Sequence, residues 1–321
     1  MQPSCSIVIP TRERLPQLRR CLEAIASCDY PAHRMEIIIV DDSSSGSTHL
    51  NESLSTLPRH LHVSVRKTPG IGPAGARNLG AQAAGGDILA FTDDDCRVDA
   101  AWLRTLTAAL ASSPIVAAGG YTVNNLRNNR WSAASQRIID LVYAYYNADP
   151  HHATFLTTNN FAVHKQRFQE VGGFNERYRT AEDRDFCRRW LAAKNQMVFV
   201  PDALVYHEHE LTFSGFLRQQ FGYGRGAYQF LRDGVPQGQI HVVKNFYASM
   251  PRLISSLSGQ NGAAGTPRFR LLGELALWQA ANLAGFAWQA ARSSLRTTSL
   301  QRKQETRRPK EPSIGRMNTK P

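Results

Sequence analysis

The stretch Ile88–Arg97, ILAFTDDDCR, places three consecutive aspartates directly behind a short apolar run. The run ILAF has the composition of a buried strand, so Asp93, Asp94 and Asp95 fall at its carboxyl end. Carboxylates this close repel one another and raise one another's pKa. A divalent cation would relieve the repulsion, and Mg²⁺ or Mn²⁺ suits such hard oxygen ligands. The alternative is a solvated acidic turn that caps the helix predicted from Asp99.

Short apolar runs alternate with helical patterns on both sides of this stretch. Strands are predicted at residues 5–10, 35–44, 62–67 and 87–95, and helices at residues 15–28, 76–85 and 100–113. This alternation predicts βαβ units and an α/β fold with a mostly parallel, Rossmann-like sheet flanked by helices. Ligands of such sheets gather beyond the carboxyl ends of the strands, where Pro10, Asp41–Asp42 and Asp93–Asp95 fall.

The composition is that of an ordinary globular protein with an uneven charge. The chain has 321 residues, of which 42% are hydrophobic and 20% charged, and its formal net charge is +12. From Arg292 onward there are nine Lys or Arg residues against two acidic ones. This basic tail raises nucleic-acid binding as an alternative. Because no helix-turn-helix or stacking-rich motif accompanies it, we expect no specific nucleic-acid partner.

The five cysteines are odd in number and show no CxxC spacing. This pattern argues against a disulfide framework and favours a reducing cytoplasm. The N-terminal residues run into a strand pattern without the layout of a signal peptide. No run of eighteen apolar residues predicts a membrane span. We therefore expect a cytoplasmic protein.

Further polar groups follow other predicted strands. Asp41 and Asp42 end the run IIIVDD, where a carboxylate can accept hydrogen bonds from a ribose hydroxyl or a base. Capping of the next segment is the alternative for Asp42. The glycine-rich residues 69–80 lack the P-loop lysine and the GxGxxG spacing. Their one strong donor is Arg77, which can reach a base or a phosphate.

Two more candidate groups lie later in the chain. Glu182 and Asp183 open a predicted helix over residues 181–195, where the helix dipole favours negative charge and would keep Asp183 ionised. A helix cap with internal Asp–Arg pairs, in which Asp185 takes part, is the alternative. His207 follows a strand predicted within residues 197–209, and both a ligand role and a packed structural role fit it. His209 is a weaker candidate.

Six motifs follow one another along the chain: SIVIPTRER, IIIVDDSS, GPAGARNLG, ILAFTDDDC, VGGFNERY and AEDRDF. In this order, over roughly residues 4–210, they resemble glycosyltransferase family 2 with a GT-A fold. The resemblance implies an inverting transfer of a sugar from a nucleotide-diphosphate donor, with Mg²⁺ or Mn²⁺ as the cofactor. It also implies a glycan or lipid-linked acceptor and a role in cell-surface polysaccharide synthesis. A nucleotide-sugar-binding protein without turnover is the alternative.

The residues and the resemblance together assign the site. Asp183 matches the catalytic base of the family. Asp95 and His207 are the expected metal ligands, with Asp94 as the alternative to Asp95. The nucleotide sugar is expected to contact Pro10, Thr11, Glu13, Asp41, Asp42, Arg77, Asp93 and Asp94. Contacts to the acceptor or the diphosphate are expected from Asn160, Glu182, Arg218 and Arg225, with Asn159 beside Asn160 in the same motif.

The chain divides by pattern into three parts. We expect a GT-A catalytic domain over residues 1–212, a helical extension over 213–292 and a disordered basic tail over 293–321. Residues 259–267 have the composition of a linker. The segment 213–233 departs from the QxxRW pattern of processive relatives, which favours transfer of one sugar per encounter. Packing of an amphipathic helix on the catalytic domain is the alternative for this segment.

The long helix predicted over residues 269–292 has two interpretations. Its apolar side chains either pack on the core or a partner subunit, or lie in a membrane interface beside the basic tail. The side chains concerned are Leu271, Leu272, Leu275, Trp278, Leu283, Phe286 and Trp288. We favour the second, and so expect peripheral attachment to an anionic membrane surface at the inner face of the cell membrane.

Overall fold

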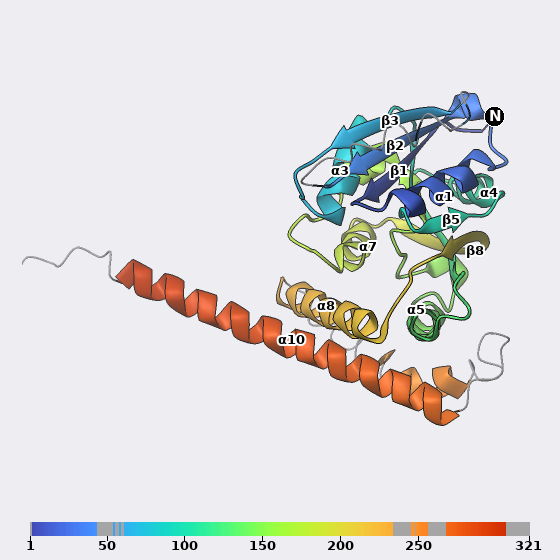
Figure 1. Ribbon diagram of the computed structural model, residues 1–321. Helices are drawn as coiled ribbons and strands as arrows, with labels where there is room; N and C mark the ends of the chain where they lie inside the picture. Colours follow the sequence, from blue (N-terminus) through green and yellow to red (C-terminus); the bar gives the residue numbers. More distant parts are fainter. Residues whose placement is uncertain are drawn as a thin grey trace, which may run out of the picture.

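The computed structural model describes residues 2–43, 54, 58, 61–233, 245–246, 248–255 and 268–305, with side chains of the last helix described from 269 to 294. An eight-stranded sheet lies at the centre, in the order β3-β2-β1-β4-β7-β6-β8-β5. Helices cover it, and two further long helices, α8 and α10, lie below its edge (Figure 1).

The strands are β1 Cys5–Thr11, β2 Met35–Asp41, β3 His62–Lys67, β4 Ile88–Phe91, β5 Cys96–Val98, β6 Val116–Asn124, β7 Phe161–His164 and β8 Gln196–His207. The helices are α1 Leu15–Ala26, α3 Pro73–Ala83, α4 Trp102–Leu110, α5 Arg130–Tyr146, α6 Lys165–Glu170, α7 Glu182–Ala192, α8 Phe213–Arg232 and α10 Arg268–Glu305, with short 3₁₀ turns at Ala32–Arg34 and Pro150–His152.

One half of the sheet is parallel. Strands β3, β2, β1 and β4 pair side by side in the same direction, with α1 between β1 and β2 and α3 between β3 and β4 along the chain. The apolar residues of β1, β2 and β4 are buried because helices cover both faces. The α/β fold and the parallel arrangement predicted from the first half of the sequence are confirmed.

The other half of the sheet is mixed. Strand β7 runs antiparallel to both β4 and β6, β8 runs parallel to β6, and β5 runs antiparallel to β8. The sequence did not predict β5, β6 or β7. Strands β5 and β7 are only 3 and 4 residues long, and β6 carries the pair Gly119–Gly120 in its middle. Segments this short, or interrupted by glycines, show too little hydrophobic periodicity for a strand to be predicted.

The pairing of β5 with β8 positions the acidic stretch. Cys96 lies opposite His207 in the antiparallel register, and the amide of Glu208 donates to the carbonyl of Asp95 at 2.8 Å. In β8 the register with β6 shifts: Gly120 pairs with Val200, but the next residue, Tyr121, pairs with Leu204. This bulge lets β8 continue to the edge where β4 ends. The end of β8 therefore meets the aspartates that follow β4.

The sheet separates two apolar cores. One contains Leu18, Leu22 and Ile25 of α1 together with Trp102 and Leu106 of α4. The second contains residues of α3, α5, α6 and α7 and reaches Leu271, Leu275 and Trp278 of α10. The C-terminal helix is thus packed onto the catalytic domain.

Helices α8 and α10 cross at close range through glycines. A Cβ atom added at Gly224 would lie 1.9 Å from the carbonyl oxygen of Asn282. A Cβ atom added at Gly285 would lie 2.0 Å from the carbonyl oxygen of Phe221. Only hydrogen fits at either position, so the two backbones approach closely where the helices run side by side (Figure 1).

A buried carboxylate also attaches α10 to α5. Glu274 of α10 is 3% exposed and pairs with Arg137 of α5. Arg130 at 3.5 Å and Arg270 at 3.1 Å complete its surroundings. A buried carboxylate with several cationic partners fixes the position of the helix that bears it.

The apolar side chains of α10 divide between two surroundings. Leu271, Leu275 and Trp278 are buried in the core, whereas Leu272 and Leu283 are exposed. Packing on the core thus holds for the buried side chains, and membrane attachment through the exposed ones stays a prediction. None of the helices in the described ranges has a stretch long and apolar enough to cross a membrane.

The C-terminal boundaries differ from those expected. Helix α10 begins at Arg268 and continues to Glu305, so residues 293–305 are helical where a disordered tail was expected from Ser293. The predicted linker, residues 259–267, and the end of the tail, residues 306–321, lie outside the described residues.

Candidate active site

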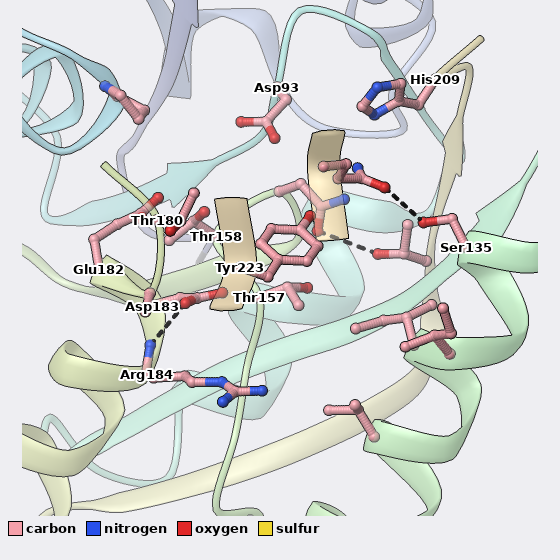
Figure 2. Close-up of a pocket in the computed structure, with 18 of the residues that line it drawn as sticks. Asp93, Ser135, Thr157, Thr158, Thr180, Glu182, Asp183, Arg184, His209 and Tyr223 are labelled. Carbon is pink, nitrogen blue, oxygen red and sulfur yellow. Dashed lines mark hydrogen bonds between the residues drawn. The ribbon is translucent and has the colours of Figure 1, made fainter. Parts of the chain in front are cut away.

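A cavity of about 1130 Å³ opens at the carboxyl ends of β1, β2 and β4. Its other walls come from α5, α7, α8 and α10. Figure 2 shows side chains from both sides of this space, with Asp93 and His209 on one side and Glu182, Asp183 and Arg184 on another. Residues far apart in the sequence therefore share one compartment.

The strand tips form one end of the cavity. Pro10, Thr11 and Asp42 line it, as expected. The carboxylate of Asp42 accepts the amide N–H groups of Ile71 at 2.7 Å and Gly72 at 2.8 Å. Asp42 thus holds the glycine-rich loop against the strand tips, and the segment that it would cap in the alternative, from residue 44, lies outside the described residues.

Two expected donor contacts lie outside the cavity. Asp41 is buried below Asp42 and accepts the amide N–H of Ser43 at 3.2 Å. Glu13 is exposed, with a left-handed φ of 57°, and does not line the cavity. Its neighbours Arg12 and Arg14 do line it. The expectation that Asp41 and Glu13 contact the donor is corrected, because backbone direction at Thr11–Arg14 turns the arginines inward.

Each aspartate of the triplet has a partner in the cavity wall. Arg77 donates to Asp93 at 2.6 Å, and Arg14 donates to Asp95 at 2.9 Å and to Asp94 at 3.3 Å. Thr11 Oγ1 also donates to Asp94, at 2.7 Å. All three carboxylates line the cavity. The triplet is therefore not a solvated helix-capping turn.

The alternative interpretation had the aspartate triplet cap the helix that follows it, which is α4. The hydrogen bonds at the start of α4 are instead accepted by Asp99. Its carboxylate accepts the amide N–H of Ala101 at 2.9 Å, and its carbonyl accepts that of Trp102. The three aspartates are thus free to face the cavity.

Burial and repulsion act differently on two of these carboxyls. Burial, followed by the charge of Asp95, raises the pKa of Asp94 to about 6. Burial would also raise the pKa of Asp95, but the hydrogen bond and charge of His207 hold it well below its usual value. Asp95 is thus the carboxylate that stays ionised.

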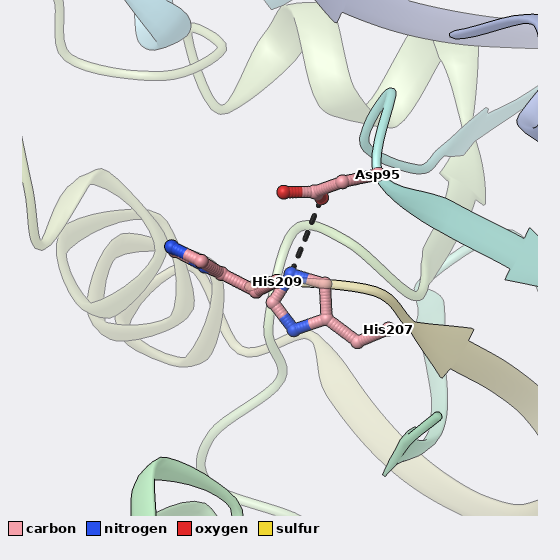
Figure 3. Close-up of side chains that lie close together, drawn as sticks. All are labelled: Asp95, His207 and His209. Carbon is pink, nitrogen blue, oxygen red and sulfur yellow. Dashed lines mark ion pairs between the residues drawn. The ribbon is translucent and has the colours of Figure 1, made fainter. Parts of the chain in front are cut away.

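Asp95, His207 and His209 form a cluster that could hold a metal ion. One ligand atom of each lies within 4.8 Å of the others. His207 Nε2 is 3.2 Å from Asp95 Oδ1, and Figure 3 shows His209 beside this pair. Burial alone would lower the pKa of His207, but the hydrogen bond and charge of Asp95 outweigh burial, so the pKa of His207 is raised. The pKa of His209 is lowered by burial and by the charge of His207.

The donor atoms of this cluster fit a divalent metal. One carboxylate and two imidazoles, all lining the cavity, match the mixed nitrogen and oxygen ligands of transition metals better than the all-oxygen shell of Mg²⁺. His209 was underrated from the sequence. Its H-x-H spacing from His207 places both rings on the same side of an extended segment, and that signal identifies the pair.

Asp183 and Glu182 lie across the cavity from the aspartates. Glu182 accepts a hydrogen bond from Arg77 at 3.0 Å. Burial and the charge of Asp183 raise the pKa of Glu182 to about 7. Burial also raises the pKa of Asp183, against the opposing charge and amide N–H of Arg184. The helix dipole was expected to help keep Asp183 ionised, whereas burial is the largest effect and raises its pKa.

The first turn of α7 begins at a strained residue. Ala181 has φ 74°, in the left-handed region, and no side chain caps the helix. Such a conformation costs about 1–3 kcal/mol and is typical of functional sites. The pairing role goes to Asp185, which binds Arg188 at 2.8 Å and Arg189 at 2.7 Å, as expected. Among the residues that the structure describes, Asp183 makes no such pair, and it lines the cavity.

Asn160 lies beneath the site. It is fully buried, accepts from Trp102 Nε1 at 2.9 Å and donates to the carbonyls of Ala203 at 2.8 Å and Tyr121 at 3.2 Å. Its amide is fully used, so the expectation of an acceptor or diphosphate contact is corrected. Its neighbour Asn159 lines the cavity instead.

The arginines expected from α8 also point elsewhere. Arg218 is exposed and does not line the cavity. Arg225 donates to Gln289 at 3.2 Å and stacks on Trp288 at 4.6 Å, so it supports the contact between α8 and α10. The helical repeat turns Tyr223 into the cavity instead (Figure 2).

The fold and this site together define a class of enzyme. A GT-A sheet with acidic strand ends, a candidate metal cluster and a carboxylate across one cavity is the arrangement of a glycosyltransferase. The sequence profile described as glycosyl transferase family 2 matches residues 6–172, more than half of the chain, and the chain belongs to this family.

Curated relatives carry the same class of activity. Glycosyltransferase AglE from Haloferax volcanii is 25% identical over 228 residues, which cover 71% of this chain and 74% of AglE. Pre-mycofactocin glycosyltransferase from Mycobacterium tuberculosis is 26% identical over 227 residues, covering 69% of this chain and 46% of that protein. The protein is a glycosyltransferase.

Solved structures show the same fold. The mannosyltransferase PcManGT from Pyrobaculum calidifontis, solved with GDP-Man and Mn²⁺, has a TM-score of 0.57 and 18% identity, covering 94% of this chain and 87% of its own. GalNAc-T7, solved with UDP, GalNAc and Mn²⁺, has a TM-score of 0.52 and 17% identity, covering 77% and 54%. At these identities the likeness concerns the GT-A fold alone.

Proposed function

We propose that the protein is an inverting, metal-dependent hexosyltransferase. It moves a sugar from a nucleotide-diphosphate donor to a hydroxyl group of a glycan or lipid-linked acceptor, in cell-surface polysaccharide synthesis. One observation carries the proposal: a single cavity contains both the Asp95–His207–His209 cluster and Asp183. A donor diphosphate would lie against the first, and an acceptor hydroxyl against the second.

The residues of the chain divide the reaction between them. Asp183 takes the proton from the acceptor hydroxyl as its oxygen bonds to the anomeric carbon. The bond from that carbon to the diphosphate oxygen breaks, and the nucleoside diphosphate leaves with the electron pair. Attack from the face opposite the leaving group inverts the anomeric centre. The raised pKa of Asp183 suits this role, because a stronger base accepts a proton more readily.

Asp95, His207 and His209 would hold the divalent ion. When bound there, it supplies Lewis-acid stabilisation of the charge on the departing diphosphate. The two imidazoles favour Mn²⁺ over Mg²⁺, and the Mn²⁺ in the PcManGT and GalNAc-T7 structures supports this choice. Arg14 and Arg77 lie close enough to add positive charge on the protein side.

The exposed face of α10 supports peripheral attachment to a membrane. Phe269, Leu272 and Leu283 are 79%, 57% and 63% exposed and share one face of the helix at 100° per residue. An exposed apolar stripe of this kind suits the surface of a bilayer, and the basic residues that the sequence carries after Arg292 would favour an anionic one at the inner face of the cell membrane.

Thermal shift with a panel of nucleotide sugars, with and without Mn²⁺, tests the proposal first. We expect at least one UDP-, GDP- or dTDP-sugar to stabilise the protein only when Mn²⁺ is present. The stabilising donor then enters a turnover assay, and NMR of the product establishes the anomeric configuration. Stabilisation without release of nucleoside diphosphate, even into water, would instead support a nucleotide-sugar-binding protein without turnover. A retained anomeric configuration would refute the inverting mechanism.

A further inference from the structure

The cavity continues beyond Asp183 into a region with a different lining. We call this region the apolar arm and define it by Ile138 and Val142 of α5, Phe230 and Leu231 of α8, and Leu283 and Phe286 of α10. The donor end, by contrast, is lined by Asp42, Asp93, Asp94 and Asp95. Asp183 belongs to the helix that contacts both regions: its neighbour Glu182 is linked through Arg77 to Asp93, and Arg188 lies over Phe230 of the arm at 5.8 Å. The cavity therefore has a polar end, a reaction centre and an apolar end.

A nucleotide sugar has nothing to place in the apolar arm. Its base, ribose, diphosphate and hexose are polar or charged, and burying them against hydrocarbon costs hydrogen bonds to water. A hydrocarbon chain gains from the same surroundings, since each buried methylene group contributes roughly a factor of four in affinity. The arm thus fits the acceptor, and specifically the apolar portion of one.

Cationic side chains stand at the neck of the arm. Arg184 follows Asp183 directly, lines the cavity, and places its guanidinium 5.8 Å from the ring centre of Phe155. In the described part of the chain no carboxylate forms an ion pair with that guanidinium. Arg188 lies nearby but is occupied by Asp185. An anionic group next to the acceptor hydroxyl would find its partner in Arg184.

The arm also reaches the surface at a suitable place. Leu283 lines the cavity and is nevertheless 63% exposed, so it stands at an opening. The same residue belongs to the exposed stripe of α10 that includes Phe269 and Leu272. A chain leaving the arm here would continue along an apolar surface and would not enter water.

We propose that the apolar arm binds the hydrocarbon chain of a lipid-linked acceptor, with its anionic headgroup at Arg184 and its reacting hydroxyl at Asp183. The inference rests on the proposed function, since it assigns the acceptor class of that same site. It commits to a lipid, because hydrocarbon lining, an unpaired cation and an opening on an apolar surface occur together.

Binding of alkyl phosphates tests the arm without any turnover. Trp278 lines the cavity, so its fluorescence reports occupancy. We expect dodecyl phosphate, used below its micelle concentration, to bind at least tenfold more tightly than butyl phosphate, which shares its headgroup. Leu283→Asp should remove most of this difference. Leu272→Asp, on the exposed stripe but outside the cavity, should leave it unchanged.

A second comparison tests the contact between Arg184 and the anionic headgroup. Arg184→Gln should weaken dodecyl phosphate at least fivefold and leave neutral dodecyl maltoside unaffected. Equal affinity for butyl and dodecyl phosphate would overturn the proposal, as would equal weakening by Leu283→Asp and Leu272→Asp. Binding of UDP- or GDP-sugars with Mn²⁺ is measured on the same samples. Loss of donor binding in the wild type refutes the proposed function, whereas intact donor binding without chain-length dependence refutes only the lipid acceptor.

Discussion

Arg77 Nη2 lies 2.6 Å from Asp93 Oδ1, and the other terminal nitrogen of the same guanidinium lies 3.0 Å from Glu182. The arginine is 3% exposed and follows the glycine-rich loop. It therefore connects the acidic strand end to the first turn of α7, which carries the base. The two halves of the reaction centre share one rigid cation.

Removing this cation should destabilise the protein. Arg77→Met keeps the volume but leaves Asp93 and Glu182 facing each other without a countercharge. We expect the free energy of unfolding to fall by about 3–5 kcal/mol, the range for breaking a buried pair. Urea unfolding measures it. Arg19→Met, which breaks an exposed pair with Glu23, serves as the control and should cost well under about 1 kcal/mol. Similar losses in both variants would contradict the bridging role.

Asp183→Asn should abolish base catalysis while sparing donor binding. The substitution removes the proton acceptor without changing the shape of the cavity, so we expect kcat to fall by about 10²–10⁴-fold. The affinity for nucleoside diphosphate with Mn²⁺, measured by calorimetry, should change less than about twofold. Asp202→Asn, at an exposed position, is the matched control. Full activity in Asp183→Asn would remove Asp183 from the catalytic role.

The raised pKa of Glu182 should appear in the pH dependence of stability. Its pKa rises from 4.5 to about 7 on folding, so the folded protein binds this proton more tightly. The resulting stabilisation is complete below the unfolded pKa and is lost as pH rises through the folded one. Glu182→Gln cannot titrate there. The unfolding free energy of wild type minus that of the variant should therefore decrease between about pH 4.5 and about pH 8; a constant difference would contradict the burial of this carboxyl.

His209→Ala should weaken metal binding. We expect the affinity for Mn²⁺, followed by EPR titration, to drop by about 10–100-fold, the range for losing a group that supports a metal site. His33→Ala, at an exposed position far along the chain, should bind Mn²⁺ as the wild type does. An unchanged affinity in His209→Ala would exclude this imidazole from the cluster.

The crossing of α8 and α10 offers a matched pair of glycines. Gly224→Ala places a methyl group against the backbone of Asn282, so α10 must shift and the protein should lose about 1–3 kcal/mol of stability. Gly222, on the same helix, has no atom within 4 Å of an added Cβ. Gly222→Ala should instead gain about 0.5–1 kcal/mol. Thermal unfolding of the two variants compares them, and shifts of the same sign would contradict the close crossing.

The parallel half of the fold could be predicted because its strands are covered on both faces. Near-continuous apolar runs such as β2 identify such strands, and the polar residues at their ends mark the ligand edge. Asp93, Asp94 and Asp95 were therefore found from position alone. In the mixed half, β5 and β7 escaped prediction because they are short and gain their stability from pairing with distant segments.

The misplaced site residues outside helix α8 share one cause. Their motif gives the position along the chain but not the direction of the side chain. Glu13 and Asn160 stand one residue away from Arg14 and Asn159, which do line the cavity. In extended or irregular backbone, neighbouring side chains point in opposite directions, so an offset of one residue exchanges a side chain that faces the cavity for one that points away from it.

The antiparallel register of β5 and β8 has a consequence for how the metal cluster tolerates change. Asp95 and His207 meet because Cys96 pairs with His207, so main-chain alignment determines their separation. A point substitution in β8 leaves that alignment intact. A single inserted or deleted residue between the bulge and His207 would send the imidazole to the far side of the sheet. Chain length in this segment is thus as strict a requirement for the cluster as the identity of its ligands.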